Sequence, residues 1–395
     1  MFYEIIIRIF KKLIKPKILI NQAWWSLSSR QKIQFQSFFK IHFEFISFDN
    51  IKINSIDNMM RNTISSVDNM NDGFDKFFFQ SLKFSLPVSV LEGFKFRQNQ
   101  AKNFLKKNKK LKYIFNESLS ENANLLSAVG NERGILNYYI EHNYLQHQFL
   151  GNNIWYVKTK FDYFLSMGWK DSQDPNHIPT SSNYEWIIKP AKEKTIDILY
   201  ISALAQKGFP HFSSGYGEGG DRNAKSYIKM KEDFFHNLDQ KIIESIYYRD
   251  YPEQKRKTEH AINRKFNRYL KSTGVFYDDS EQNRSQELLS KSKFVICDYL
   301  STPYNSVLMS NIPAIILFNT KTYYLLDEYI DFYDDLINAN IMFTNSVKAS
   351  NFVNKIFFSI DKWWNTVEVQ NARKKYLKRN FGPKDAINNY ILSLL

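Results

Sequence analysis

The stretch LLSKSKFVICDYLSTPYNSVLMSNIPAIILFN, residues 288–319, carries the clearest indication of the fold class. Residues 294–296 and 314–318 are short apolar runs that predict two buried strands. The hydroxyl-rich turn 301–306 follows the first strand, and the proline-broken turn 311–313 precedes the second. A buried strand that leads through a polar turn to the next strand is typical of one unit in a parallel sheet.

The same alternation of strands and helices extends through both halves of the chain. In the first half we expect strands at 17–20, 43–48, 86–94, 111–118 and 135–143, and helices at 97–110 and 121–134. In the second half we expect strands at 197–204, 245–252 and 275–280, a helix at about 224–238, and one or two amphipathic helices at 350–381. This order predicts parallel sheets flanked by helices.

Two polar stretches interrupt the alternation. Residues 49–75 are rich in Asn, Asp and Ser, and they predict a loop-dominated insertion. Residues 169–194 contain three prolines and predict an interdomain linker. The predicted fold class is therefore α/β, with two Rossmann-like domains of the GT-B type and a ligand cleft between them. We expect four parts, with boundaries at 1–16, 17–180, 181–360 and 361–395.

Composition indicates a folded, reduced protein with an anionic partner. Of 395 residues, 43% are hydrophobic and 16% aromatic, which excludes wholesale disorder. The single Cys297 excludes a disulfide framework and a cysteine-based zinc site, and it favours the cytoplasm. A net charge of +14 suits nucleic acid, an acidic membrane face or phosphorylated small molecules. An AT-rich genome would also enrich Lys, Asn, Ile and Phe.

The N-terminal segment 1–16 is basic and amphipathic. Read as a helix, it places apolar residues on one face and Lys and Arg around the rest, a pattern that fits an anionic membrane surface. A helix packed on its own protein explains the same pattern. No run of 18 uncharged apolar residues exists, so no membrane-spanning helix is expected.

Two loops are candidate ligand sites. The turn after the strand at 294–296 offers hydroxyls and backbone amides to a phosphate or ribose, at a helix N-terminus. Its candidate residues are Ser301, Thr302, Tyr304, Asn305 and Ser306. An ordinary strand-to-helix turn with a capping Ser explains this turn equally well. The loop GFPHFSSGYGEGGDRN, 208–223, holds five glycines, which let backbone approach a ligand closely. Its candidate residues are Tyr216, Glu218 and Arg222.

The glycine loop matches neither GxGxxG nor the Walker pattern, so no nicotinamide cofactor and no NTPase site is expected. The alternative is that the glycine loop is a surface loop with no part in ligand binding or catalysis. Arg249 and Asp250 end a predicted strand, and an Arg there can bind phosphate with two hydrogen bonds. A surface Arg–Asp pair is the alternative. No HExxH is present, and the YDD triplets at 277–279 and 333–335 are not Asp-x-Asp, so no metal is expected.

Several segments in order resemble a known family. These segments are KILINQAWWSLSSRQ, ERGILNYYIEHN, FLSMGWKD, SYIKMKEDFFHNL, SIYYRDY, SKFVICDYLSTPYNSVLMSNIPAIILFN and DKWWNTVEVQNARKKYLKRNF. The chain resembles, over about 17–382, the transferases of bacterial surface-polysaccharide (O-antigen and capsule) clusters first described in spirochaetes. More distantly it is similar to the retaining Kdo transferases of capsule assembly.

The family motifs are only partly retained. The family's Gln-His-Gly corresponds to Glu141-His142-Asn143, and its Trp-Gly-Trp to Met167-Gly168-Trp169. The resemblance makes Glu141 and His142 the candidate catalytic residues, since a His there can transfer protons near neutral pH. Thr302 is retained, but the family's acidic position reads Ser306, which leaves ribose binding to Asn305 and Ser306.

The resemblance implies a metal-independent glycosyltransferase of surface-polysaccharide biosynthesis. It would move a sugar from a nucleotide-sugar donor, with CMP-linked sugars among the candidates, to a glycan or lipid-linked acceptor. Residues 17–180 would face the acceptor and 181–360 would bind the donor. The expected location is the cytoplasm, with peripheral contact at the inner membrane. The alternative is a catalytically silent GT-B-like module that binds a glycan or an assembly partner. Nucleic acid is not expected, because no nucleic-acid module is recognised.

Overall fold

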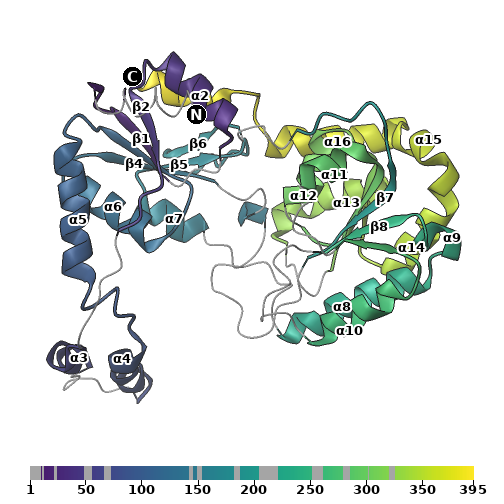
Figure 1. Cartoon of the computed structure of the whole chain (residues 1–395), viewed down its shortest axis with the longest axis horizontal. Helices are drawn as coiled ribbons and strands as arrows, with labels where there is room; N and C mark the ends of the chain where they lie inside the picture. The colour runs from purple at the N-terminus through teal and green to yellow at the C-terminus, as the bar shows by residue number, and fades with distance from the viewer. Residues whose placement is uncertain are drawn as a thin grey trace. The chain divides into compact units, whose positions relative to one another are not determined.

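Two parallel sheets of six strands form the frame of the protein. The computed structural model describes residues 10, 13–21, 25–48, 56–65, 73–141, 146–148, 154–181, 187–203, 221–250, 261–278, 285–300, 302–319 and 325–395. The strand order is β2-β1-β3-β4-β5-β6 in the first sheet and β12-β11-β10-β7-β8-β9 in the second. Helices flank both sheets (Figure 1), so the predicted α/β class with two Rossmann-like halves of the GT-B type is confirmed.

The first sheet is built from short strands in the first half of the chain. They are β1 (Ile18–Asn21), β2 (Ile41–Glu44), β3 (Tyr113–Asn116), β4 (Leu136–Ile140), β5 (Tyr163–Ser166) and β6 (His177–Pro179). The helices of this half are α2 (Leu27–Gln36), α3 (Asn58–Ser65), α4 (Gly73–Ser85), α5 (Phe94–Lys107), α6 (Glu121–Asn131) and α7 (Ile154–Lys160), with a 3₁₀ turn η1 (Gln146–Gln148). β1 is buried along its whole length and pairs in parallel with β2 and β3, as expected for a central strand.

The region 49–94 differs from expectation. The predicted loop-dominated insertion contains α3 and the start of α4, which pack against each other. The strand predicted at 86–94 is wrong, because a series of turns occupies most of this stretch and α5 begins at Phe94. Pro87 lacks a backbone N–H for a strand ladder, and Arg61 donates to the carbonyl oxygen of Leu86 at the start of the stretch.

Arg61 anchors α3 to the segment before α5. Its Nε lies 2.7 Å from Glu92 Oε1, and its Nη2 lies 2.8 Å from Glu92 Oε2. Both side chains are largely buried, and the hydrogen bond from Arg61 lowers the pKa of Glu92 to about 2. A two-point pair of this kind fixes orientation as well as charge. It therefore holds α3 against the start of α5.

The stretch expected to be an interdomain linker contains a strand. β6 lies within 169–194 and pairs in parallel with β5, with Phe164 opposite His177. It occupies the edge of the first sheet, where its terminal Pro179 needs no ladder partner on the outer side. Pro179 is also the reason that sequence pattern alone does not predict a strand here.

The second sheet is built from strands in the second half of the chain. They are β7 (Ile196–Ile201), β8 (Ile246–Arg249), β9 (Phe276–Asp278), β10 (Ser292–Cys297), β11 (Ala314–Leu317) and β12 (Met342–Phe343). The helices are α8 (Asp221–His236), α9 (Gln240–Ile243), α10 (Ala261–Lys271), α11 (Ser285–Lys291), α12 (Thr302–Met309) and α13 (Ile330–Asn338), with a 3₁₀ turn η3 (Asp327–Tyr329). Figure 1 shows α8, α10 and α14 (Ser346–Ile356) on one side of this sheet and α12, α13 and α16 (Val367–Asn380) on the other.

The stretch 288–319 folds as predicted, as β10, α12 and β11. β10 and β11 are parallel neighbours, with Val295 opposite Ala314, and their apolar side chains are fully buried. Asn311 adopts φ 54°, a left-handed conformation that Asn tolerates, and it turns the chain sharply from α12 toward β11. The polar turn thus separates a central strand from the helix that leads to the next strand.

The C-terminal part is helical. It comprises α14 (Ser346–Ile356), a 3₁₀ turn η4 (Phe357–Ser359), α15 (Ile360–Trp364), α16 (Val367–Asn380) and α17 (Ala386–Ser393). Contacts divide the chain into two compact units. The first takes in Met1–Ile140, Phe161–Tyr163 and Ile391–Leu395, and the second takes in Glu141–Lys160 and Phe164–Tyr390.

Two glycines let backbone segments cross in the second unit. Gly168 has φ +139° and forms an isolated bridge with Phe381, while Gly382 N donates to Met167 O at 2.8 Å. A Cβ at Gly168 would lie 1.9 Å from Gly382 N, and a Cβ at Gly382 would lie 1.6 Å from Thr180 O. Both positions therefore require glycine.

The amphipathic segment 1–16 lies largely outside the described residues. Phe10 is described, and its ring stacks on Phe39 with centroids 4.2 Å apart. This end of the segment therefore packs against the protein itself. Within the part of the chain that the structure describes, no helix combines the length and the apolar character needed to cross a bilayer.

Candidate functional site

The second sheet has a topological switch point between β7 and β10. From β7 the chain moves outward to β8 and β9, and from β10 it moves the other way to β11 and β12. In open parallel sheets, ligands bind beyond the carboxyl ends of the strands at such a point, because the two connections diverge and leave room. The residues that follow β7 and β10 are therefore the natural place to look for a site.

Asp298 follows β10 directly and is 2% exposed. Its Oδ1 accepts hydrogen bonds from Ala203 N at 3.1 Å and from the Tyr227 hydroxyl at 2.7 Å. Its Oδ2 is buried and has no hydrogen-bond partner among the described residues. Burial raises the pKa of this carboxyl group, and the positive charge of Lys231 opposes the shift. Asp298 thus places a buried carboxylate oxygen at the switch point, near the side chains of Tyr200 and Ser202.

Lys231 supplies a buried positive charge beside this carboxyl group. It is fully buried on α8, and its ammonium group donates to Ser202 Oγ at 3.1 Å and to the Tyr248 hydroxyl and Asn263 Oδ1 at 3.3 Å. The Tyr227 ring lies 4.7 Å from the same nitrogen, a cation–π distance. A buried charge is tolerated only when paired and hydrogen-bonded, and this environment meets both conditions.

Arg249 and Asp250 lie at the carboxyl end of β8, at the same edge. Arg249 is the last residue of β8, lies opposite Ile201 and Asp278, and is half-buried. Its carbonyl oxygen accepts from Ser202 N at 3.2 Å. Asp250 is buried and accepts from Asn267 Nδ2 at 3.0 Å and from the Tyr277 hydroxyl. Asp250 therefore ties α10 and β9 to the strand end that carries Arg249.

The predicted residues on α12 mostly face the protein interior. The Tyr304 and Tyr376 hydroxyls lie 2.5 Å apart, and the Tyr376 hydroxyl donates to Asn305 Oδ1 at 3.1 Å. Ser306 is buried, and its hydroxyl donates to the Thr302 carbonyl oxygen at 3.1 Å. These contacts tie α12 to α16. Thr302, half-buried in the first turn, is the described residue of this group nearest the strand end.

Glu141 follows β4 of the first sheet and is fully buried. Its Oε2 accepts from Met167 N at 2.9 Å and from Trp169 Nε1 at 2.8 Å, and its Oε1 lies 3.5 Å from His147 Nδ1. The His147 ring stacks on Trp169 with centroids 4.2 Å apart. Glu141 therefore fixes the turn at 167–169, the segment that resembles the family's Trp-Gly-Trp.

Several predicted site residues lie outside the described part of the chain. They are His142, Tyr216, Glu218 and Ser301, together with the side chain of Arg222, whose backbone lies in the first turn of α8. The structure brings Arg249 and Asp250 together at one sheet edge with Ser202 and Asp278.

Asp298, Tyr227 and Lys231 are the residues that sequence reasoning missed. Asp298 is the first polar residue after β10, and the strand-end rule could have identified it. Tyr227 and Lys231 are four residues apart and share one face of α8. A lysine on an amphipathic helix normally faces water, so nothing in the sequence distinguishes Lys231 from its exposed neighbours.

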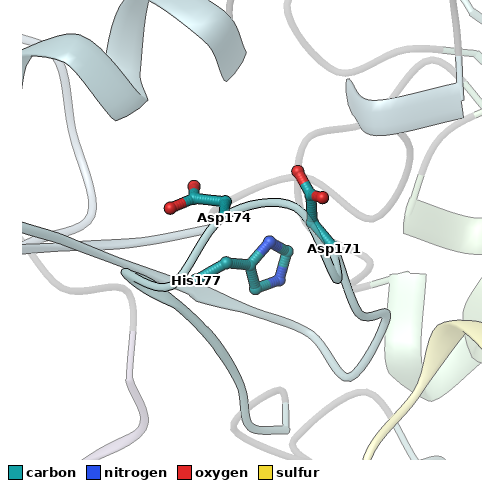
Figure 2. A group of neighbouring side chains, drawn as sticks. All are labelled: Asp171, Asp174 and His177. Atoms are coloured by element: carbon teal, nitrogen blue, oxygen red, sulfur yellow. The ribbon is translucent and has the colours of Figure 1, made fainter.

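One group in the described residues has the side-chain types of a metal site. Asp171 and Asp174 lie in the loop between β5 and β6, and His177 is the first residue of β6. Figure 2 shows the three side chains close together, with the imidazole ring beside the two carboxylates. Burial lowers the pKa of His177, and the positive charge of Lys158 acts in the same direction. Both effects favour the neutral imidazole, which is the form that binds metals.

Comparison with known proteins gives one family and a set of similar folds. The LIC12162 family transferase profile matches residues 1–391. No curated protein matches the chain. Among solved structures, S. aureus MnaA with UDP has 9% identity and a TM-score of 0.50, covering 96% of this chain and 98% of that chain.

Two further structures cover nearly all of the chain. A crystal structure from Listeria monocytogenes, described as a UDP-N-acetylglucosamine 2-epimerase, has 9% identity and a TM-score of 0.50, covering 96% of this chain and 97% of that chain. Acinetobacter baumannii MurG has 11% identity and a TM-score of 0.45, covering 96% and 99%. The Listeria structure and MnaA share the fold of this chain. At 9% identity, this similarity concerns the fold alone.

Proposed function

Because the chain belongs to the LIC12162 family of transferases, we propose that it transfers a sugar from a nucleotide-linked donor to a glycan or lipid-linked acceptor of a surface polysaccharide. The donor nucleotide would bind at the switch point of the second sheet. The observation that carries this proposal is Asp298, whose Oδ2 is buried and has no partner in the described residues. A buried polar atom left unpaired costs free energy, so a ligand that binds it gains that energy.

Asp298 is suited to a ribose or base edge. A carboxyl group with a raised pKa can accept a hydrogen bond when ionised or donate one when protonated, so it can pair with a hydroxyl or an amino group. The family's acidic position reads Ser306 in this chain, and Ser306 is committed to the helix backbone. We therefore assign the ribose or base contact to Asp298, with Thr302 and Ser301 beside it.

The phosphates would lie toward β8. Arg249 is half-buried and is the last residue of β8, the strand next to β7. Its guanidinium group can bind phosphate oxygens with two hydrogen bonds. The charge that develops on the leaving phosphate would be stabilised by Arg249 and by the fixed positive charge of Lys231. The glycine loop would close over the donor, and its candidate contacts are Tyr216, Glu218 and Arg222.

His142 is the proposed proton-transfer residue, next to Glu141 at the end of β4. Both oxygens of Glu141 face protein groups, so we assign it the task of holding the strand end and the 167–169 turn in place. A general acid or base needs such fixed positioning, because small displacements reduce proton transfer. The rest of the catalytic set would then be supplied by the acceptor and the donor phosphate.

Peripheral contact with an anionic membrane would bring a lipid-linked acceptor to the site. α4 exposes several aromatic side chains, and Lys76 and Lys83 lie on the same helix. The exposed apolar residues of this helix are Phe74, Phe77, Phe78 and Phe84. An aromatic face combined with basic residues matches the chemistry of an anionic bilayer surface, as does the basic segment 1–16.

A thermal-shift panel of CMP-, UDP-, GDP- and dTDP-linked compounds tests the donor proposal. UDP is an informative member, because MnaA of the same fold was solved with it. At 100 times its Kd a ligand adds about 2.7 kcal/mol of stability, a shift of several degrees in Tm for domains of this size.

Asp298→Asn tests where that nucleotide binds. We expect it to abolish the shift, whereas Asp197→Asn, an exposed carboxylate near the opposite end of β7, should retain it. A panel without any shift would favour the silent, glycan-binding alternative.

A further inference from the structure

The loop between β5 and β6 and the first residue of β6 bring together two carboxylates and one imidazole, at a sequence spacing of three residues. Asp171, Asp174 and His177 each offer one ligand atom, and these atoms lie within 4.8 Å of one another. The two aspartates are half-buried, whereas His177 is only 7% exposed. Figure 2 shows one ring nitrogen of His177 on the side of the ring that faces the carboxylates.

The hydrogen bonding of His177 leaves that nitrogen unused. Its Nε2 lies 3.0 Å from the carbonyl oxygen of Trp169, which can only accept, so Nε2 carries the proton. Nδ1 then has a lone pair, and it is buried without a hydrogen-bond partner among the described residues. Metal-binding histidines show this arrangement, in which the nitrogen that does not bind the metal donates to a backbone carbonyl and fixes the ring.

A lysine already places positive charge between the carboxylates. Lys158 Nζ lies 2.6 Å from Asp171 Oδ2 and 3.0 Å from Asp174 Oδ2, and its side chain is largely buried. Lys158 is in the last turn of α7, and its ammonium group is at the end of a flexible four-carbon side chain. An ammonium group can only donate hydrogen bonds, and it satisfies the carboxylates without using the buried nitrogen of His177.

We propose that Asp171, Asp174 and His177 form a site for a divalent transition metal, with Lys158 as the competing cation that occupies it when no metal is bound. One imidazole nitrogen and two carboxylate oxygens are ligands that zinc accepts in proteins, and a water would complete four-coordination. Magnesium prefers oxygen ligands in an octahedron and gains little from the imidazole. Affinity should therefore follow Zn²⁺ over Mn²⁺, with Mg²⁺ the weakest.

The proposed site departs from the expectation from sequence that no metal binds. That expectation rested on known motifs, HExxH and Asp-x-Asp, which this chain lacks. The spacing Asp-x-x-Asp-x-x-His falls in a polar loop where isolated acidic residues are common. Only the inward-facing Nδ1 of His177 distinguishes the group from a solvated loop.

Isothermal titration calorimetry with ZnCl₂ on the full-length chain tests the proposal. We expect saturable binding of one ion, which Asp174→Asn weakens by more than about 10-fold, since loss even of supporting groups costs metal sites that much. Lys158→Met should strengthen binding by a similar factor, because it removes the competing charge and keeps the apolar side chain. A gain of affinity cannot come from misfolding, so this variant tests the site independently of His177→Ala.

His236→Ala is the matched control. His236 is an exposed histidine on α8, and surface histidines bind zinc weakly on their own. Its loss should leave the tight binding unchanged. Titration with CoCl₂ adds a spectroscopic readout, since the visible absorption of the bound ion should disappear in His177→Ala. Three results would overturn the proposal. Zinc binding could be unchanged in every site variant, it could be lost in His236→Ala, or neither the wild type nor Lys158→Met could bind zinc.

Discussion

The Tyr227 hydroxyl lies 2.7 Å from Asp298 Oδ1, and this contact joins α8 to the end of β10 at the switch point of the second sheet. The same hydroxyl lies 2.9 Å from Ala203 N, which follows β7. One side chain thus connects the two strands whose connections diverge. Because both residues are buried, the pair sets the geometry of the proposed nucleotide site before any ligand binds.

Removing this hydroxyl should destabilise the protein without changing its packing. Tyr227→Phe leaves a buried carboxylate oxygen with one partner fewer, and such a loss costs about 1–3 kcal/mol. Urea unfolding should show a lower midpoint with an unchanged m-value. Tyr156→Phe, at an exposed ring on α7, should change stability by no more than about 0.5 kcal/mol. Equal midpoints for the wild type and Tyr227→Phe would show that the contact contributes nothing.

Arg249→Ala should weaken nucleotide binding with little effect on folding. The loss of a charge-assisted hydrogen bond to phosphate costs about 1.5–3 kcal/mol, or roughly 10- to 100-fold in Kd. Calorimetric titration with whichever nucleotide raises Tm measures this change. Arg268→Ala, an exposed position on α10, is the control and should bind like the wild type. An unchanged Kd for Arg249→Ala would remove Arg249 from the site.

The Arg61–Glu92 pair should make stability depend on acid pH. Its hydrogen bond lowers the pKa of Glu92 to about 2 from an ordinary value of 4.5, so the pair stabilises the fold fully above about pH 4.5. That contribution is lost as the pH falls from 4.5 toward 2, because the folded state must then accept a proton that it binds poorly. Unfolding midpoints between pH 6 and pH 3 should therefore fall less in Glu92→Gln than in the wild type.

Glu132→Gln removes an exposed carboxylate, and it serves as the reference for general acid effects. It should track the wild type over the same pH range. If Glu92→Gln also tracked the wild type, the ion pair would not contribute to stability.

Deleting residues 1–15 should reduce sedimentation with anionic vesicles and leave nucleotide binding intact. Each Lys or Arg near an anionic surface contributes about 1 kcal/mol, and salt screens this contribution. Co-sedimentation at two salt concentrations measures it. Phe77→Ser combined with Phe78→Ser tests α4 separately, and its effect should persist at high salt because it removes apolar contact.

Equal sedimentation of all three proteins would exclude both membrane contacts. An insoluble truncation would instead indicate that the segment is part of the packed domain, as the stacking of Phe10 on Phe39 shows for one residue.

The central strands β7, β10 and β11 of the second sheet could be predicted closely from sequence because nearly all of their residues are buried. Continuous apolar runs such as 294–296 and 314–318 leave few alternatives to a central strand. The predictions failed where local pattern and tertiary contact disagree. Residues 86–94 carry apolar side chains at strand-like density, but Pro87 has no N–H to donate and Arg61 binds the carbonyl oxygen of Leu86.

The candidate site was predictable only in part, for a related reason. Arg249 is visible because a cation at a strand end has few structural explanations. Lys231 could not be predicted as a site residue from sequence. Its burial results from the packing of α8 with α10 and the second sheet, and not from its sequence neighbours. The residues of α12 show the reverse case. Tyr304 and Asn305 follow a strand as ligand-binding residues do, but Tyr376 from a distant helix pairs with their side chains.

The backbone crossing at Gly168 and Gly382 has a consequence for mutant screens. A random library assayed for activity would lose function at both positions as completely as at the end of β10, because any side chain there meets another backbone at under 2 Å. The two glycines would then be mistaken for catalytic positions, Gly168 more readily because it sits beside Trp169 in a family-like motif. The amount of folded protein distinguishes the two causes. We expect variants at the crossing to fail to accumulate, and variants at Arg249 to accumulate normally and bind nucleotide more weakly.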